Sequence, residues 1–294
     1  MPSTKYIGID IGGTKMHIGV VQNGVVVQEK RFETAATAPQ AQILEELASH
    51  LEALLDAEVA GIGIGTPGLV DEANGIIYNV QNIPSWQQVP LKQFLAGRFG
   101  KPVYITNDAN AFAVGEKMYG QGQPFAHLVG LVLGTGVGAG LILNHDVHAG
   151  VLSSAGEFGC LPYRDKTFEE YCSGKFFTLH TGRPGAEWHA LARQGDPAAL
   201  AVLTEYGRHL GHLIKTMLFT VAPQAVFLGG SVSKCFEYFR GGLQETLREF
   251  PFPKVVEQLV IAPSTLDNAA VLGAAALCHL KQELPSHPST VPSL

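Results

Sequence analysis

The sequence predicts an α/β protein built from a duplicated unit, with a site between its two halves. Two β-hairpins of similar design, at residues 6–21 and 128–143, each carry small residues and glycine at the turn. When the hairpins are aligned, the turn at Gly12 falls on the turn at Gly134. An internal repeat of this kind indicates a duplicated architecture. Chance similarity between two glycine-rich hairpins is the alternative.

Hydrophobic periodicity predicts the individual elements. Asn23-Gly24 predicts a type I′ turn that closes a hairpin before residues 25–27. Alternating or continuous apolar runs predict strands at 6–10, 16–21, 30–34, 60–65, 102–106, 128–133, 139–143 and 225–228. Apolar residues at helical spacing predict helices at 38–55, 91–99, 109–119, 198–221 and 268–280.

Composition excludes several classes of protein. The chain has 294 residues, of which 46% are hydrophobic and 16% charged, which is typical of a folded globular protein. The net charge is −6 and no run of Lys or Arg occurs, so we expect no nucleic-acid partner. We find neither a secretory apolar segment at the N-terminus nor the roughly 18 consecutive apolar residues of a membrane helix. Four scattered cysteines without a CxxC pair are expected to be free thiols, and the protein is expected to be cytoplasmic.

Three glycine turns follow predicted strands: Gly12-Gly13-Thr14, Gly134-Thr135-Gly136 and Gly229-Gly230-Ser231. Glycine lets backbone N–H groups approach an anion closely, and a neighbouring hydroxyl adds a donor. An ordinary tight turn is the alternative for any one of them. None matches GxxxxGK[ST] or a GxGxxG that opens a helix, which disfavours a P-loop kinase and a Rossmann oxidoreductase.

Two aspartates near these turns lie at a strand end, Asp10 as the last residue of one strand and Asp108 shortly after another. Asp10 precedes the first glycine turn, where a carboxylate beside phosphates calls for a divalent cation such as Mg²⁺, held partly through water. Asp108 lies between a strand and a helix, where a carboxylate is placed to take a proton from a hydroxyl. The alternatives are a turn cap for Asp10 and a helix N-cap for Asp108.

The order of the motifs resembles that of the ROK family (repressors, open reading frames and sugar kinases). Each motif alone is weak, but their order and spacing together are specific, and they extend from Asp10 to about Gly273. The matching segments are Asp10–Lys15, Gly65–Asp71, Asn82–Trp86, Asn107–Ala111, Gly134–Gly140, Ala155–Gly159 and the turn at Gly229-Gly230-Ser231.

The resemblance implies an actin-like ATPase (ribonuclease H-like) fold, with two α/β domains that flank a cleft and close over sugar and nucleotide. We expect a smaller N-terminal domain at residues 1–112, completed by a C-terminal helix at about 268–284. A larger domain would span residues 113–267. The Pro- and Ser-rich tail at 285–294 is expected to be disordered.

The resemblance also implies roles for individual residues. Asp108 would be the catalytic base, and Asp10 would hold Mg²⁺ through water. The sugar hydroxyls would be bound by Asn82, Asn107, Asp108, Glu157 and Glu169. The nucleotide would be bound by Gly12, Gly13, Thr14, Lys15, Gly134, Thr135, Gly136, Gly229 and Gly230. For Glu157 and Glu169, a solvated surface charge is the alternative.

The chain departs from the family pattern at Cys160. Many ROK kinases have a His at this position, followed by a Cys-rich zinc cluster that has no counterpart here between residues 162 and 168. Cys160 and Cys172 are too few to form a structural zinc site, and His180 and His189 are more simply structural, so we expect no zinc. The loss of an imidazole expected to touch the sugar puts the choice of hexose in doubt.

These inferences lead to an ATP-dependent hexose kinase that phosphorylates a sugar hydroxyl, with the 6-hydroxyl of glucose as the expected acceptor. An N-acetylglucosamine or N-acetylmannosamine kinase and a fructokinase are alternatives that the sequence does not separate. A sugar-sensing regulator is disfavoured because the first strand begins by Tyr6, which leaves no room for a helix-turn-helix. An actin-like ATPase acting on a protein partner is disfavoured by Asn107-Asp108 and Gly156-Glu157, which suit polyhydroxyl ligands. A homodimer is left open.

Overall fold

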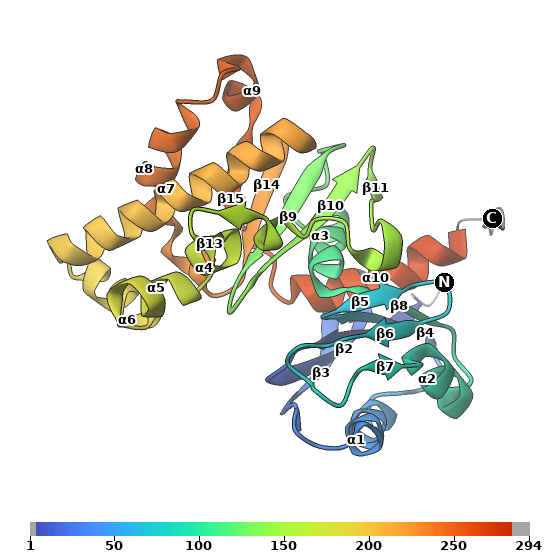
Figure 1. The fold of residues 1–294 in the computed structure, drawn as a ribbon. Coiled ribbons are helices and arrows are strands. Elements are labelled where there is room, and N and C mark those ends of the chain that lie inside the picture. The colour runs from blue at the N-terminus through green and yellow to red at the C-terminus, as the bar shows by residue number, and fades with distance from the viewer. Residues whose placement is uncertain (1–3, 284–294) are drawn as a thin grey trace, which may run out of the picture.

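The computed structural model describes residues 4–283 and contains two five-stranded sheets (Figure 1). The first sheet has the order β3-β2-β1-β4-β8 and the second has the order β11-β10-β9-β14-β15. The first consists of β1 (Lys5–Ile11), β2 (Lys15–Gln22), β3 (Val25–Glu33), β4 (Val59–Thr66) and β8 (Val103–Asn107). The second consists of β9 (Leu128–Leu133), β10 (Val137–Leu143), β11 (Asp146–Val147), β14 (Ala225–Gly229) and β15 (Val260–Pro263).

The two sheets share one topology. In each, an antiparallel three-stranded ribbon is followed by two parallel strands: β1 pairs with β4 and β4 with β8, as β9 pairs with β14 and β14 with β15. Gly8 pairs with Gly19 in the first hairpin, and Gly130 pairs with Gly140 in the second. The predicted duplication is therefore confirmed, and the actin-like architecture with two α/β halves around a cleft is the one observed.

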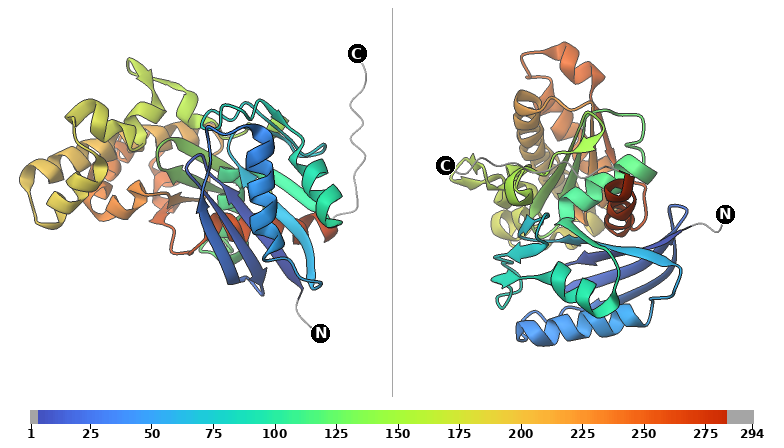
Figure 2. Two further views of the ribbon diagram at one scale, coloured as in Figure 1. Left: turned by 90° about the horizontal axis from the view of Figure 1, so that it is seen from below. Right: turned by 90° about the vertical axis from the view of Figure 1, so that its right-hand side faces the viewer.

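Two helices lie between the sheets, α3 (Asp108–Tyr119) and α10 (Ala269–Glu283) (Figure 2). They approach each other closely because glycine occupies both sides of their contact. A Cβ atom at Gly115 would lie 2.1 Å from the Ala269 carbonyl oxygen, and one at Gly273 would lie 1.7 Å from the Ala111 carbonyl oxygen. The first residue of α3 is Asp108, so this packing fixes where the proposed base lies.

Separate hydrophobic cores support a division of the chain into two domains. One core contains buried residues from Ile7 to Ile105, and another contains buried residues from Val129 to Phe250. The helix α1 (Gln40–Glu52) covers the face of the first sheet that is turned away from α10 (Figure 2). On this basis we propose the boundaries 1–112 and 113–267, with α10 completing the first domain. Residue 284 and the tail expected to be disordered lie outside the described residues.

The remaining elements extend the two halves. The first half adds α2 (Leu91–Phe99) and a small sheet, and the second adds helices on one side of its sheet (Figure 1). The small sheet consists of β5 (Leu69–Asp71), β6 (Ile76–Tyr78) and β7 (Gln88–Val89). The added helices are α4 (Phe168–Cys172), α5 (Lys175–Thr181), α6 (Gly185–Arg193), α7 (Pro197–Thr220), α8 (Phe236–Leu247) and α9 (Pro253–Gln258).

The prediction of a third strand at 30–34 was wrong in its extent. In the structure β3 is a single strand over Val25–Glu33, and the turn at Asn23-Gly24 has positive φ at both residues, as a type I′ turn requires. The polar and charged run from Gln28 to Arg31 hid the continuity. Such residues are common on an edge strand, where they discourage pairing with another chain.

Candidate active site

Asp10 and Asp108 face each other across a position that has no side chain. In the register of the first sheet Asp10 pairs with Gly65, and Gly65 pairs with Thr106, two residues before Asp108. A Cβ atom at Gly65 would lie 2.9 Å from Ala111 Cβ and 3.4 Å from Asp108 Cα. Glycine at this position therefore lets the start of α3 pack closely on β4, next to Asp10 of β1.

The two carboxyl groups are in a strongly unfavourable environment for charge. Burial, and after it the neighbouring charge of Asp108, raises the pKa of Asp10 to about 7. Burial also raises the pKa of Asp108, although hydrogen bonds from the backbone N–H groups of Ala109 and Asp108 oppose the shift, and the charge of Glu157 adds to it. Perturbed carboxyl groups at a cleft are a mark of functional sites.

The alternative interpretation of Asp108 as the helix N-cap is not what the structure shows. The N-cap of α3 is Asn107, whose side-chain oxygen accepts a hydrogen bond from the Ala109 N–H at 2.9 Å. Asp108 is the first helical residue, and its Oδ1 accepts from the same N–H at 2.9 Å. Asn107 therefore orients the start of α3, and the proposed contact of its amide with the sugar remains a prediction.

We expect Gly65→Ala to lower both stability and activity. The added methyl group would press on Ala111 and on the Asp108 backbone, and overpacking of this kind costs about 1–3 kcal/mol. Urea unfolding and a sugar-kinase assay measure the two effects. Gly97→Ala is the matched control, since a Cβ atom there meets nothing within 4 Å. Equal stability and activity of the two variants would contradict the role given to Gly65.

A cavity of about 470 Å³ lies between the two sheets, beside Asp10. Its size is within the range of small-molecule sites. Of the predicted nucleotide-binding residues, Lys15, Gly229 and Gly230 line it, together with two further basic residues, Arg31 and Lys234. The turns at Gly12–Thr14 and Gly134–Gly136 are not part of this lining.

Each of these two turns lies against one of the residues predicted to bind the sugar. A Cβ atom at Gly13 would lie 2.3 Å from Asn82 Cβ. Glu169, at the start of α4, accepts a hydrogen bond from the Val137 N–H at 3.2 Å, and a Cβ atom at Gly136 would lie 2.5 Å from its Oε2. Asn82 and Glu169 are therefore packed beside the glycine turns.

Glu169 is paired with a lysine. Lys175 Nζ lies 2.5 Å from Glu169 Oε1, and this hydrogen bond raises the pKa of Lys175. The pair is about one third exposed, with side-chain accessibilities of 31% for Glu169 and 41% for Lys175. Glu169 is therefore not a solvated surface charge without a partner in this structure.

Glu157 is exposed and lies on the second half, just before the short 3-10 helix Phe158–Cys160. Its charge is close enough to raise the pKa of Asp108. The Cys160 thiol lies 3.6 Å from Glu157 Oε2, and burial together with the Glu157 charge raises the pKa of Cys160. The thiol at this position is therefore a weak, mostly neutral neighbour of the proposed sugar-binding carboxylate.

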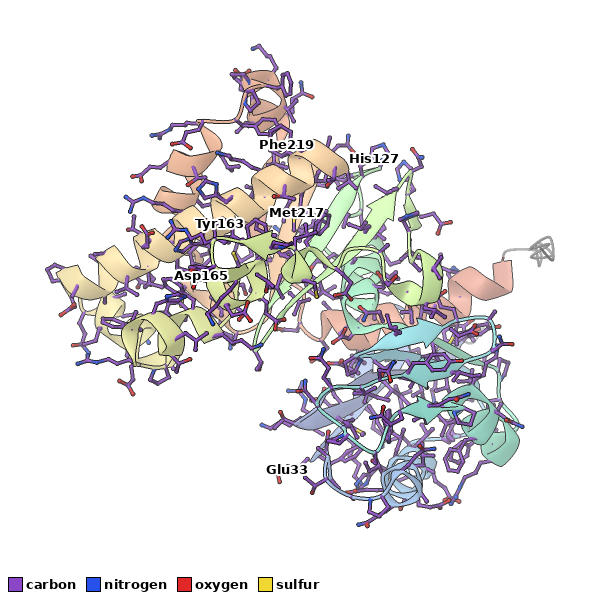
Figure 3. The ribbon with its side chains drawn as sticks, in the orientation of Figure 1. Glu33, His127, Tyr163, Asp165, Met217 and Phe219 are labelled. Carbon is purple, nitrogen blue, oxygen red and sulfur yellow. The ribbon has the colours of Figure 1, made fainter. Side chains whose placement is uncertain are left out.

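The segment that follows Cys160 is a hairpin, β12 (Pro162–Tyr163) and β13 (Lys166–Thr167). Its side chains Tyr163 and Asp165 point toward the helices of the second half (Figure 3). Tyr171 donates a hydrogen bond to Asp165, and Tyr163 stacks on Phe168 with ring centroids 4.3 Å apart. The hairpin leads directly into α4 and so into Glu169.

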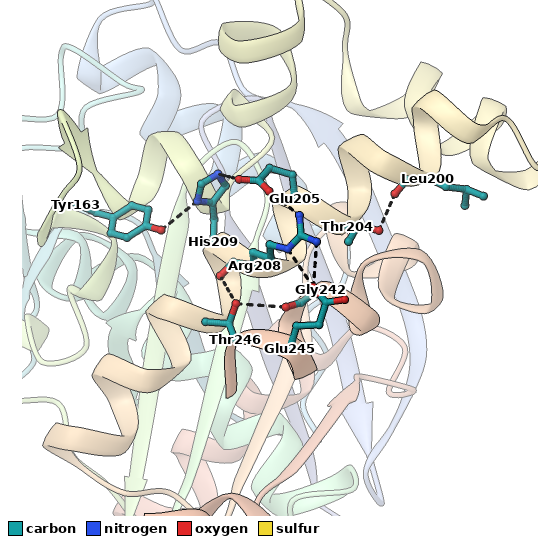
Figure 4. A network of polar contacts seen from close by, with 9 residues as sticks. All are labelled: Tyr163, Leu200, Thr204, Glu205, Arg208, His209, Gly242, Glu245 and Thr246. Carbon is teal, nitrogen blue, oxygen red and sulfur yellow. Dashed lines mark hydrogen bonds and ion pairs between the residues drawn. The ribbon is translucent and has the colours of Figure 1, made fainter. Parts of the chain in front are cut away.

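A polar network on α7 anchors this hairpin (Figure 4). The Tyr163 hydroxyl lies 3.0 Å from His209 Nδ1, and His209 Nε2 lies 3.4 Å from Glu205. Burial, together with the charge of Arg164, lowers the pKa of His209 to about 4, so the ring is neutral at physiological pH. Arg208 then links Glu205 of α7 to Glu245 of α8. Neutral hydrogen bonds and aromatic packing thus hold the segment in place.

Sequence reasoning missed two of the basic residues at the cavity and a contact that fixes one of them. Arg31 Nη2 donates to Asn268 Oδ1 at 2.8 Å, which joins the edge strand β3 to the residue before α10. Asn268 has a left-handed backbone, with φ of 58°. Charged residues on an exposed edge strand are ordinary, so nothing in the sequence distinguished Arg31 from its neighbours, and Lys234 had no motif around it.

The described residues form no complete metal site made of protein ligands alone. Among residues 4–283 no group of three or more His, Cys, Asp or Glu side chains is arranged to hold a metal ion. Asp10 fits a different mode of binding, since Mg²⁺ keeps several waters and is commonly held by one or two carboxylates and substrate phosphates. The charge of Asp108 contributes to the raised pKa of Asp10, and a cation between the two carboxylates would offset this repulsion. No helix in the same range is long and apolar enough to cross a membrane.

Comparison with known proteins agrees with this arrangement. The family model described as "ROK family" matches residues 6–281. A glucokinase from Thermotoga maritima is 31% identical, covering 94% of this chain and 98% of that protein. An N-acetyl-D-glucosamine kinase from Escherichia coli O157:H7 is 32% identical, covering 78% of this chain and 84% of that protein.

A solved structure gives the same result for the fold. A ROK family glucokinase from Streptomyces griseus, in complex with glucose and AMPPNP, superposes with a TM-score of 0.81. It is 28% identical, and the alignment covers 94% of this chain and 99% of that one. The family match over nearly the whole chain, together with the duplicated sheets around a cleft, shows that the chain belongs to the ROK family.

Proposed function

We propose that this protein is an ATP-dependent sugar kinase that phosphorylates the 6-hydroxyl of glucose, with Asp108 as the general base. The observation that carries the proposal is the position of Asp108. It is the first residue of α3, its pKa is raised by burial, and it lies next to Asp10 at the cleft. The resemblance to two glucokinases, one of which was solved with glucose and AMPPNP, supports glucose as the acceptor.

In the proposed mechanism the protein positions the reactants and supplies one proton acceptor. The Asp108 carboxylate accepts the proton of the attacking hydroxyl, while Asn82, Asn107, Glu157 and Glu169 bind the other hydroxyls. A raised pKa makes Asp108 a better proton acceptor than an ordinary carboxylate. Closure of the two halves over the sugar would keep water from competing as the acceptor.

The nucleotide would occupy the cavity between the two sheets. Gly229 and Gly230 line one side of it, while Lys15 and Arg31 place positive charge at the other. Backbone N–H groups of the turns at Gly12–Thr14 and Gly134–Gly136 are proposed to hold the phosphates. Mg²⁺, held by Asp10 through water, would supply charge neutralisation for the phosphoryl group.

An acceptor panel tests the proposal. Purified protein would be incubated with Mg-ATP and glucose, mannose, fructose, N-acetylglucosamine or N-acetylmannosamine while ADP release is followed. We expect glucose to give the highest kcat/KM. If only an N-acetylhexosamine or fructose stimulates ADP release, that sugar is the acceptor in place of glucose, and the assignment as a sugar kinase stands.

The second acceptor class has its own support. One relative of similar identity is an N-acetyl-D-glucosamine kinase, and the small thiol of Cys160 stands beside Glu157 where a bulkier imidazole would restrict the site. The panel therefore decides between a hexose and an N-acetylhexosamine. ATP binding without stimulation of ADP release by any sugar would favour the sensor alternative and overturn the kinase.

A homodimer also remains a proposal, and analytical sedimentation of the purified protein would test it.

A further inference from the structure

Glu72 connects the two halves of the molecule through one carboxylate oxygen. The Thr106 hydroxyl donates a hydrogen bond to Glu72 Oε1 at 2.6 Å, and the Ser153 hydroxyl donates to the same oxygen at 3.0 Å. Thr106 belongs to β8 of the first sheet, whereas Ser153 lies in a 3-10 turn (Val151–Ser153) after β11 of the second sheet. Glu72 follows β5, which lies against this turn (Figure 1).

The two hydroxyl groups depend on this carboxylate for their hydrogen bonds. Thr106 is 1% exposed and Ser153 is 3% exposed, so neither hydroxyl can exchange its partner for bulk water. Asn110, also buried, donates to Thr106 Oγ1 at 3.4 Å and extends the chain of bonds into α3. A charged acceptor makes such hydrogen bonds stronger than neutral ones.

Two residues that make these bonds are close in sequence to residues of the proposed sugar site. Thr106 precedes Asp108 by two residues, and Ser153 precedes Glu157 by four. Leu152 and Ser153 both have left-handed backbones, with φ of 51° and 54°. Non-glycine residues hold such a conformation only where surrounding contacts enforce it. The bond to Glu72 is such a contact, and it fixes the turn from which the Glu157 segment starts.

We infer that Glu72 is a positioning residue for the sugar site, which sets the distance between the Asp108 and Glu157 segments across the cleft. The inference rests on the kinase function proposed above, because Asp108 and Glu157 are the groups that it would align. Glu72 does not need to touch substrate in this role. Its loss would allow the turn at Val151–Ser153 to move and would weaken sugar binding, while the ATP cavity would keep its lining.

Substitutions at both ends of the bond test the inference. We expect Glu72→Ala and Ser153→Ala each to raise the KM for the sugar about tenfold and to leave the KM for ATP within about twofold. The double variant should match Glu72→Ala, because that substitution already removes the bond to Ser153. Glu72→Gln keeps an oxygen that accepts both hydrogen bonds, so its sugar KM should stay within about threefold of the unmodified protein.

Ser154→Ala is the matched control, since the Ser154 hydroxyl bonds only within its own turn, to the Val151 carbonyl oxygen at 2.6 Å. Hydrogen exchange of residues 148–157 in the ligand-free protein supplies a readout that needs no activity. We expect exchange there to be at least about tenfold faster in Glu72→Ala and Ser153→Ala than in Ser154→Ala.

The outcomes separate this inference from the proposed function. An unmodified protein without sugar-stimulated ADP release would refute the kinase, and the exchange experiment would still decide whether the bond holds the turn. In an active enzyme, faster exchange with an unchanged sugar KM would overturn the positioning role. Additive effects in the double variant, or equal behaviour of Ser153→Ala and Ser154→Ala, would overturn it as well.

Discussion

Asp108→Asn is expected to lower kcat by about 10³-fold, within the range of about 10²–10⁴ that a general base contributes. The amide has the size of the carboxylate and can still accept the Ala109 N–H bond seen at 2.9 Å, so the start of α3 should keep its geometry. The amide oxygen is, however, far too weak a base to take the proton of a sugar hydroxyl. Steady-state ADP release with saturating glucose and ATP measures the change, and calorimetric titration with glucose measures binding.

Sugar binding should survive this substitution within a few-fold. Asp146→Asn, an exposed carboxylate on β11 whose Oδ1 accepts from the Val147 N–H, is the control for the chemical change itself. The base assignment would be refuted by loss of glucose binding with a largely retained turnover rate. That pattern would make Asp108 a binding residue and leave proton removal to another group or to solvent.

Asp10→Asn has the second largest expected effect, and it acts in opposite directions on activity and stability. The pKa of Asp10 is about 7 in the folded protein, well above the ordinary value of 3.8 that applies when the chain is unfolded. The folded state therefore binds the proton more tightly than the unfolded state. The contribution of Asp10 to the stability of the folded state is greatest below about pH 4, falls as the pH rises toward 7, and stays at the lower level above that.

In Asp10→Asn the side chain cannot ionise, so the stability of the variant does not fall in this way as the pH rises. Without nucleotide or magnesium we expect the melting temperatures of Asp10→Asn and the unmodified protein to converge near pH 4. At pH 8 the variant should be more stable by on the order of 4 kcal/mol, because the pKa shift from 3.8 to about 7 spans roughly three units and each unit corresponds to about 1.4 kcal/mol. Thermal unfolding between pH 4 and pH 9 measures the difference. Kinase activity should fall by at least about 10²-fold, because a metal-positioning carboxylate is lost.

Magnesium supplies the decisive comparison. Mg-ATP should raise the melting temperature of the unmodified protein more than that of Asp10→Asn, because a cation favours the ionised carboxylate. A stability difference that does not grow between pH 4 and pH 7 would refute the raised pKa. Equal stabilisation of both proteins by Mg-ATP would refute the metal role and leave the pH effect standing.

Local sequence signals predicted the repeated part of the fold and the positions of the two aspartates. Gly12 and Gly134 marked both hairpins, and the strand boundaries around Asp108 were off by a residue at most. These features depend on turn chemistry and on residues close in the sequence. The sequence did not show which residue caps α3, because both Asn107 and Asp108 suit an N-cap. Only the backbone geometry assigns the cap to Asn107.

Local sequence signals could not predict contacts between segments that are distant in the chain. Glu72 lies just outside the matching segment Gly65–Asp71, and its two hydroxyl partners lie 34 and 81 residues away in the chain. The small sheet β5-β6-β7 has strands of two or three residues, too short to show an alternating pattern. The resemblance to a family supplied roles for individual residues, but no periodicity could show which of them meet in space.

The burial of α10 has a consequence for the biosynthesis of the protein. A Cβ atom at Gly8 would lie 1.9 Å from the Val271 carbonyl oxygen, and one at Gly63 would lie 1.7 Å from that of Ala274. The strands β1 and β4 are thus shaped to fit a helix that is translated more than 200 residues later. A nascent chain can form the hairpin β1-β2 early, but the face of the first sheet opposite α1 stays uncovered until α10 has been translated and packs on β1 and β4.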